Sequence, residues 1–287
     1  MAVFRAANPP RAPRSTLTRR GLANPLVRIA IGLAPIIVIL ALYELLAISK
    51  DRVRVFPRVE VIWAALLDIA GGKGELGHAY DQILVTSGRL VAAFGAAALL
   101  GTFIGIAAGR NKLLFSFVEN LVWVFMAVPS VVWVFLFVVG LGLNPMVPIG
   151  AVGILLLPQF VVLIAEGAKS VPEDLVEMAR SYKVSTLDRL TGLFLPFLVP
   201  YLIASARVGF ATAVKVMLIA EVIGHPSGIG FEVKYWYGKL FLGPVIAWGI
   251  TMIIMGLLVD KLIFDRIEKR VSQWKSQPVE TGFGGVA

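Results

Sequence analysis

Three charged residues within one apolar stretch are the first candidates for chemistry. Arg207, Lys215 and Glu221 lie between residues 194 and 222, and all other side chains there are uncharged. Because a charge inside an apolar helix costs about 2.5–3.5 kcal/mol on membrane-insertion scales, it usually faces a bundle interior or a water-filled cavity. The three residues are therefore candidates for electrostatic contact with a charged solute along a pathway.

Each of these residues also has a structural interpretation. Arg207 suits a pairing with carbonyls or a carboxylate near the inner half of its helix. Lys215 is the better pathway candidate, although Glu221 or Glu44 would equally well neutralise it. Arg207 and Lys215 are eight positions apart, about 80° around a helix, so they can share one broad face. Arg89, at the outer end of a span, is explained equally well by snorkelling to lipid headgroups.

Covalent and metal chemistry have no obvious residues in this chain. It contains no cysteine, which excludes disulfides, thiolate metal sites and a cysteine nucleophile. The two histidines, His78 and His225, lie far apart in sequence, so an imidazole metal site is not expected. We predict no catalytic residue, no metal site and no cofactor in this chain.

The composition places these charges in a membrane protein. The chain has 287 residues, of which 58% are hydrophobic and 16% charged, whereas soluble domains carry about 25% charged residues. Since lipid does not tolerate irregular backbone, the crossings must be helices. We expect an all-α membrane protein with six transmembrane helices, at about residues 29–48, 86–109, 115–139, 146–166, 194–222 and 240–262. Turn residues from Gly140 to Pro145 join the third and fourth spans in a hairpin.

Basic residues set the expected orientation. Six arginines and no acidic residue precede the first span, so the N-terminus should be cytoplasmic and the span an uncleaved anchor. With six spans, seventeen lysines and arginines fall inside and seven outside. Residues 1–25 and 271–287 would then be cytoplasmic tails around a transmembrane domain of residues 26–270. The net charge of +9 follows this asymmetry and predicts membrane lipid, not nucleic acid, as the partner.

Two short segments are expected to be helical without spanning. Residues 58–70 have apolar side chains at helical spacing, which favours equally a helix in the outer membrane interface or a helix packed over the spans. The loop at 170–195 has two helix-start signals. Ser170-Val171-Pro172-Glu173 predicts a capping box, and Ser185-Thr186-Leu187-Asp188 predicts a second start. We therefore expect two short helices with a bend near Lys183 and Val184.

This loop resembles a known motif. Glu177-Met178-Ala179, Lys183 and Leu193-Phe194-Leu195-Pro196 resemble, with matching spacing, the EAA loop of ABC importer permeases. Lys183 departs from the pattern, because that position is normally glycine. A left-handed residue would fit there, and a lysine would cost on the order of 1 kcal/mol in that conformation.

The resemblance extends over most of the chain. Phe56-Pro57, Thr86-Ser87-Gly88-Arg89-Leu90, the glycines at 101, 105 and 109, and Ser227-Gly228-Ile229-Gly230 are similar to the subfamily that imports nitrate, taurine and alkanesulfonates, with relatives for thiamine precursors. The small residues every fourth position also indicate close helix packing. The resemblance implies the MetI-like transmembrane fold of type I ABC importers. It also favours the structural interpretation of Arg207, because this subfamily commonly has arginine at that position.

The resemblance also implies partners and roles. Two permease copies, most simply a homodimer, would form the pathway, two ATP-binding subunits would dock on the loop, and an extracytoplasmic solute-binding protein would deliver substrate. ATP and Mg would bind the ATPase subunit, since this chain lacks a G-x-x-x-x-G-K-[ST] phosphate loop. The implied ATPase-coupling residues are Glu173, Leu175, Glu177, Met178, Ala179, Arg180, Tyr182 and Lys183. Ser227, Gly228, Ile229 and Gly230 would form a loop that contacts the binding protein or acts as an outer gate, or else only a tight turn.

Two other classes of protein are weighed against this one. An ion-gradient-driven carrier would use Lys215 and Glu221 as relay groups, but inverted repeats are not evident. An intramembrane enzyme lacks an assembled set of reactive side chains. A permease subunit for a small organic or inorganic anion is the leading expectation, with a neutral heterocycle as the alternative cargo.

Overall fold

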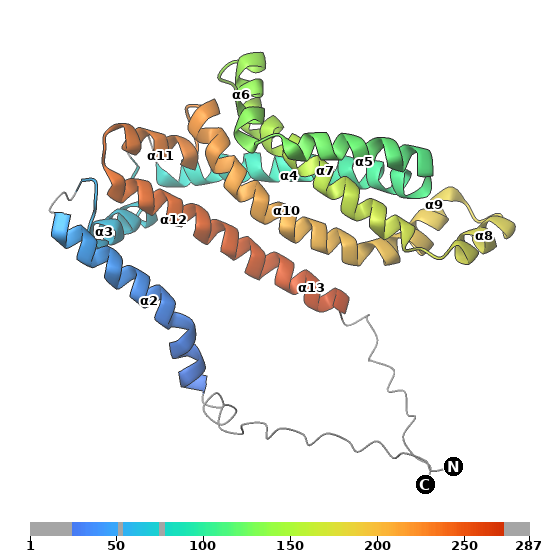
Figure 1. The fold of residues 1–287 in the computed structure, drawn as a ribbon, viewed down its shortest axis with the longest axis horizontal. Coiled ribbons are helices and arrows are strands. Elements are labelled where there is room, and N and C mark those ends of the chain that lie inside the picture. Colours follow the sequence, from blue (N-terminus) through green and yellow to red (C-terminus); the bar gives the residue numbers. More distant parts are fainter. Residues whose placement is uncertain (1–24, 51–53, 75–77, 273–287) are drawn as a thin grey trace, which may run out of the picture. The chain divides into compact units, whose positions relative to one another are not determined.

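The computed structural model describes residues 25–50, 54–74 and 78–272, which fold into helices joined by turns (Figure 1). The expected tails therefore lie almost wholly outside the described residues. The chain divides into two units, Met1–Val59 and Glu60–Ala287. Each unit is described by itself.

The described part of the first unit contains a long helix, α2 (Pro25–Lys50), over the predicted first span. The Tyr43 hydroxyl donates to the Pro57 carbonyl at 2.7 Å, and the Val59 amide donates to Glu44 Oε2 at 2.9 Å. These bonds fold the segment after the helix back onto it. Glu44 therefore has a backbone amide as its partner.

The second unit holds the other elements. In chain order they are α3 (Val59–Ala70), α4 (Ala79–Arg110), α5 (Lys112–Ala127), α6 (Ser130–Leu141), α7 (Met146–Lys169), α8 (Glu173–Ser181), α9 (Thr186–Arg189), η1 (Leu190–Phe194), α10 (Leu195–Gly224), α11 (Ile229–Gly238), α12 (Leu242–Val259), η2 (Asp260–Phe264) and α13 (Asp265–Ser272). Helices α8 and α9 lie at one end of this unit and α11 at the other (Figure 1). Helix α3 buries Ile62 and Ile69 and exposes Trp63, so it packs over the spans with one apolar face uncovered.

Glycines set the close contact between α4 and α7, the most extensive helix pair in the unit. A Cβ added to Gly105 would lie 2.8 Å from Ile164 Cβ and from the Val161 carbonyl oxygen. One added to Gly109 would lie 2.6 Å from the Ala165 carbonyl oxygen. The prediction of close packing from the spacing of these glycines is confirmed.

The predicted third span, residues 115–139, is wrong as one continuous helix. Helices α5 and α6 are bent by 90° at Val128 and Pro129. Val128 is extended, with ψ of 124°, because the proline ring disfavours helical backbone in the residue before it. The rings of Phe125 and Trp133 stack across the bend with centroids 5.0 Å apart.

Four helices of the described chain are long and apolar enough to cross a membrane, or five if the bent pair counts as one crossing. They include α4 and α7, and the continuous segments Thr186–Gly224 and Leu242–Val271. The described part of α2 adds a shorter apolar stretch, Ile37–Ser49. All-helical membrane architecture is confirmed at this level, whereas six crossings and the cytoplasmic placement of the termini stay predictions.

Two π-helical turns interrupt the long segments. η1 precedes α10, and the Leu195 amide donates to the Leu190 carbonyl, one residue further back than in an α-helix. η2 follows α12 with the same pattern between Asp265 and Asp260. Both turns lie where a long apolar helix meets a polar segment.

Candidate functional site

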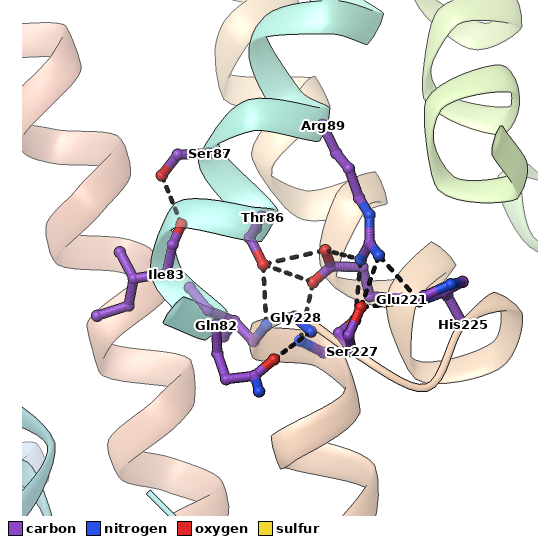
Figure 2. A network of polar contacts seen from close by, with 11 residues as sticks. Gln82, Ile83, Thr86, Ser87, Arg89, Glu221, His225, Ser227 and Gly228 are labelled. Atoms are coloured by element: carbon purple, nitrogen blue, oxygen red, sulfur yellow. Dashed lines mark hydrogen bonds and ion pairs between the residues drawn. The ribbon is translucent and has the colours of Figure 1, made fainter. Parts of the chain in front are cut away.

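A buried ion pair joins α4 to α10 (Figure 2). Arg89 Nη1 lies 2.8 Å from Glu221 Oε1, and the two side chains are 7% and 0% exposed. The Thr86 hydroxyl donates to the same carboxylate at 2.8 Å, and the Gly230 amide donates to it at 3.0 Å. Glu221 thus accepts from three donor residues on two helices, α4 and α11.

The same cluster fixes the turn between α10 and α11. Arg89 donates to the Ser227 carbonyl at 2.9 Å and to the Ser227 hydroxyl oxygen at 2.7 Å. The amides of Gly228 and Ile229 donate to side chains of α4, at 2.6 Å to Gln82 Oε1 and at 2.8 Å to the Thr86 hydroxyl oxygen.

Glycine is required in this turn. Gly228 has φ of +99°, and a Cβ there would collide with the Glu221 carboxylate. Gly228, Ile229 and Gly230 are buried. The segment is therefore a tight turn held against α4, and its role as a binding-protein contact or outer gate stays a prediction. Snorkelling of Arg89 to headgroups is wrong, because its partners lie inside the protein.

His225 lies at the edge of the same cluster and contacts Arg89. Arg89 Nη2 lies 2.8 Å from His225 Nδ1, so this ring nitrogen accepts and the imidazole is neutral. Partial burial, and next the positive charge of Arg89, lower the pKa of His225 below its ordinary value.

Arg207 binds a cluster of carboxylates at the other end of α10. Its guanidinium lies 2.9 Å from Asp260, 2.8 Å from Asp265 and also against Glu268. These acids belong to η2 and α13, so the pairing holds the end of the chain's last long helix against α10. This geometry agrees with the favoured structural interpretation of Arg207, whose charge is balanced by these carboxylates.

Lys215 lies on an uncovered face of α10. Ala204, Val208, Ala211 and Lys215 are exposed and follow one another at helical spacing. In the part of the chain that the structure describes, no ion pair is found for Lys215, and Glu221 is taken by Arg89. Arg207 and Lys215 are about 80° apart around α10, and among the described residues the carboxylates of η2 and α13 pair with Arg207. That the two residues share one broad face stays a prediction.

The predicted two-helix loop is present as α8 and α9, but the first helix begins differently. The expected capping box at Ser170 is wrong, since Ser170 ends α7: its hydroxyl donates to the Gly167 carbonyl at 2.7 Å. The N-cap of α8 is Pro172, without a side-chain bond. The second start signal is confirmed, because the Asp188 amide donates to the Ser185 hydroxyl oxygen at 3.1 Å.

One residue anchors α8 to the bundle. Val176, 4% exposed, packs with Ile164, Ala168 and Phe194 in a small apolar cluster. This residue was missing from the predicted set. On the other faces of α8, Glu173, Glu177, Met178 and Arg180 are exposed, with Tyr182 just after it, while Leu175 and Ala179 are half-buried. The apolar Met178 and Tyr182 remain 52% and 79% exposed.

Lys183 adopts the conformation of the glycine that it replaces. Its φ is +55°, and the Val184 amide donates to the Ala179 carbonyl at 3.0 Å across the turn. This is the six-to-one hydrogen bond of a Schellman motif, which ends α8. The predicted bend at Lys183 and Val184 is confirmed.

Comparisons with known proteins define the class. Residues 98–273, more than half of the chain, match the family described as binding-protein-dependent transport system inner membrane component, and the chain belongs to this family. It is an inner membrane permease subunit of an ABC importer.

Individual relatives of this family indicate a subfamily. The chain is similar to the nitrate import permease protein NrtB of Leptolyngbya laminosa, with 25% identity over 90% of this chain and 94% of the relative. It is also similar to the taurine transport system permease protein TauC of Escherichia coli (strain K12), with 24% identity over 77% of this chain and 80% of the relative. These matches agree with the nitrate and taurine subfamily indicated by the sequence motifs.

The fold has a solved counterpart. An inward-facing structure of the MetNI methionine ABC transporter matches with a TM-score of 0.52 and 19% identity, covering 64% of this chain and 93% of that chain. The likeness supports the shared transmembrane fold.

Proposed function

We propose that this chain forms, as a homodimer, the translocation pathway of an importer for a small oxyanion-bearing solute such as nitrate, taurine or another sulfonate. Separate ATPase subunits would drive alternating access, and an extracytoplasmic binding protein would deliver the solute. The observation that carries the proposal is the exposed helix α8, which presents Glu177, Met178 and Tyr182 at one end of the bundle.

Helix α8 has the features of a short helix that docks in a partner's groove. The large apolar side chains of Met178 and Tyr182 are exposed beside the Glu177 carboxylate. The buried Val176 holds the helix against the bundle. Apolar anchors at helical spacing are how such helices bind grooves. Glu177 is the central coupling residue in this proposal, with Glu173, Leu175, Met178, Ala179, Arg180, Tyr182 and Lys183 around it.

The proposed pathway runs along the exposed stripe of α10. Ala204, Val208 and Ala211 are small or medium-sized, and Lys215 places a positive charge among them. A second copy packed opposite this stripe would leave a narrow passage with a cation from each subunit. An anion would be attracted there, and the moderate charge would still let it leave. Arg207 and Glu221 are left out of the pathway because their carboxylate and guanidinium partners hold them.

The coupling proposal is tested in proteoliposomes with the partner ATPase and binding protein. Glu177→Arg should abolish solute-stimulated ATP hydrolysis while insertion stays normal. Asp81→Arg, an exposed charge reversal in the first turn of α4, is the matched control and should leave stimulation intact. Full stimulation in Glu177→Arg would refute the coupling role.

The pathway proposal is tested by uptake. Lys215→Met should lower uptake of the anionic solute at unchanged binding-protein affinity, and Lys215→Arg should retain most of it. Lys234→Met, on the exposed surface of α11, is the control. Unimpaired uptake in Lys215→Met would remove Lys215 from the pathway. Uptake driven by an ion gradient without the ATPase would instead identify a secondary carrier.

A further inference from the structure

Three arginines surround a pocket beside the α8–α9 loop. The pocket has a volume of about 260 Å³ and is lined by Arg110 at the end of α4, Arg180 of α8 and Arg189 of α9, with Thr186 and Phe194. Arg110 is distant in sequence from Arg180 and Arg189, which lie on the consecutive helices α8 and α9. The fold therefore concentrates positive charge at one point where α4 ends and the loop leads into α10.

The positive charge in this pocket is not balanced by its walls. Among the described residues no carboxylate lines it, and neither Arg110 nor Arg180 has an ion-pair partner there. The Arg110 guanidinium lies over the Phe194 ring, 5.0 Å from its centroid. Arg189 donates to the Thr186 hydroxyl at 3.2 Å, while its Nε is buried without a hydrogen-bond partner.

These features indicate that the pocket suits an anionic group that accepts hydrogen bonds. A buried donor without an acceptor is costly, so an acceptor at this point would be stabilising. Guanidinium groups present planar pairs of N–H donors that match the oxygens of a phosphate. A phosphate group would satisfy Arg189 Nε and place its charge among three cations.

The position of the pocket indicates where that phosphate comes from. Phe103, Ile106 and Arg110 lie three and four residues apart, on one face of α4. Phe103 is 66% exposed, so an uncovered apolar strip leads from the arginines along a spanning helix. Basic pockets between spanning helices at the membrane border bind anionic lipid headgroups.

We propose that the pocket of Arg110, Arg180 and Arg189 binds the phosphate of an anionic phospholipid, whose acyl chain lies along α4 at Phe103. The lipid would tie α8 and α9 to the end of α4 and so hold the loop in the conformation seen here. Arg180 then serves this pocket in addition to its place beside the proposed ATPase surface. The inference does not depend on which solute is transported.

The test uses the purified full-length chain in neutral detergent. Phosphatidylglycerol or phosphatidylcholine is added, and retained lipid is measured by native mass spectrometry. Phosphatidylglycerol should be retained in preference to phosphatidylcholine. Arg180→Gln/Arg189→Gln should weaken phosphatidylglycerol binding about thirtyfold, or about fivefold to sixfold for each arginine. Arg266→Gln, an exposed arginine of α13, is the matched control and should bind normally.

Several outcomes would overturn the proposal. Unchanged retention in the double glutamine variant would show that the lipid binds elsewhere. Equal retention of phosphatidylcholine would remove the anionic selectivity. Displacement of the lipid by millimolar inorganic phosphate would assign the site to a soluble ion, and displacement by the ATPase subunit would assign it to that interface. Arg180→Lys/Arg189→Lys, which keeps the charges, should retain most of the binding and so guards against misfolding of the glutamine variant.

Discussion

Arg89 and Glu221 are 132 positions apart in the chain, yet their side chains form a buried ion pair of 2.8 Å. Such a pair is weak evidence for stability, because desolvation of both charges offsets their attraction. In this protein the ion pair instead fixes the position of a neighbouring turn. The same two side chains bind the Ser227 carbonyl and the Gly230 amide, so the pair fixes the turn from α10 to α11 against α4.

Replacing one partner of the Arg89–Glu221 ion pair should lower the free energy of unfolding far more than replacing both. Arg89→Met leaves a buried carboxylate without its cation, and we expect a loss of about 3–5 kcal/mol in unfolding free energy. Arg89→Met/Glu221→Met should lose less than the single variant. Thermal unfolding in detergent measures the difference. A single variant as stable as the parent would show that the pair is open to water.

His225 should make this end of the molecule sensitive to acid. The folded state lowers the pKa of the imidazole, so between that value and the ordinary one of about 6.5 the unfolded chain binds more protons. Stability is therefore fully present above about pH 6.5 and falls as the pH drops below it. His225→Asn, which keeps an acceptor for Arg89, should remove this part of the pH dependence. Unfolding midpoints between pH 7.5 and 5 would reveal it, and equal slopes for both proteins would count against it.

Two glycines of α4 should respond oppositely to alanine. At Gly105 the new Cβ meets Ile164 and the Val161 carbonyl, so Gly105→Ala should destabilise by about 1–3 kcal/mol. Gly95 has no neighbour within 4 Å, so Gly95→Ala should stabilise by about 0.5–1 kcal/mol through backbone entropy. Thermal unfolding of both variants in one detergent checks the sign. The same shift for both would contradict the contact between α4 and α7.

Restoring glycine at the end of α8 should stabilise the loop. Lys183 has φ of +55°, a conformation that costs a side chain about 1–2 kcal/mol. We expect Lys183→Gly to recover most of that amount, whereas Lys183→Ala should recover none. Hydrogen exchange of the amides of Tyr182 and Val184, which close the turn, reports the change locally. Faster exchange in the glycine variant would refute the strain.

Local and periodic features were accessible from the sequence. Five of the six expected spans fall on observed helices, the cap at Ser185 is present, and the motif spacing located the bend at Lys183. The role of Arg89 was inaccessible, because its partner is fixed only once α4 packs beside α10. A signal did exist: Gln82, Thr86 and Arg89 lie at positions i, i+4 and i+7, a polar stripe on an apolar helix.

The remaining differences have local physical causes. The third span was expected to be continuous, but it is broken at Pro129, because Val128 is extended and the rings of Phe125 and Trp133 stack across the right-angled bend. Ser170 had the residue type for an N-cap, but its hydroxyl is used by the preceding helix, α7. Arg207 was assigned its structural role, yet its carboxylate partners on η2 and α13 were not identified, since they lie more than 50 positions away.

The π-helical turn η1 allows the length of the loop to change by one residue while the bundle helix α10 keeps its orientation. A π turn accommodates one residue more than an α turn, so the 190–194 segment absorbs an insertion without rotating the helix beyond it. Deleting one residue there should convert the turn to regular α-helix and keep both Ser185 and Leu198 in phase with their neighbours. Single-residue length variation is therefore tolerated at this joint, whereas the same deletion within α10 would turn Lys215 and Glu221 away from their present faces by about 100°.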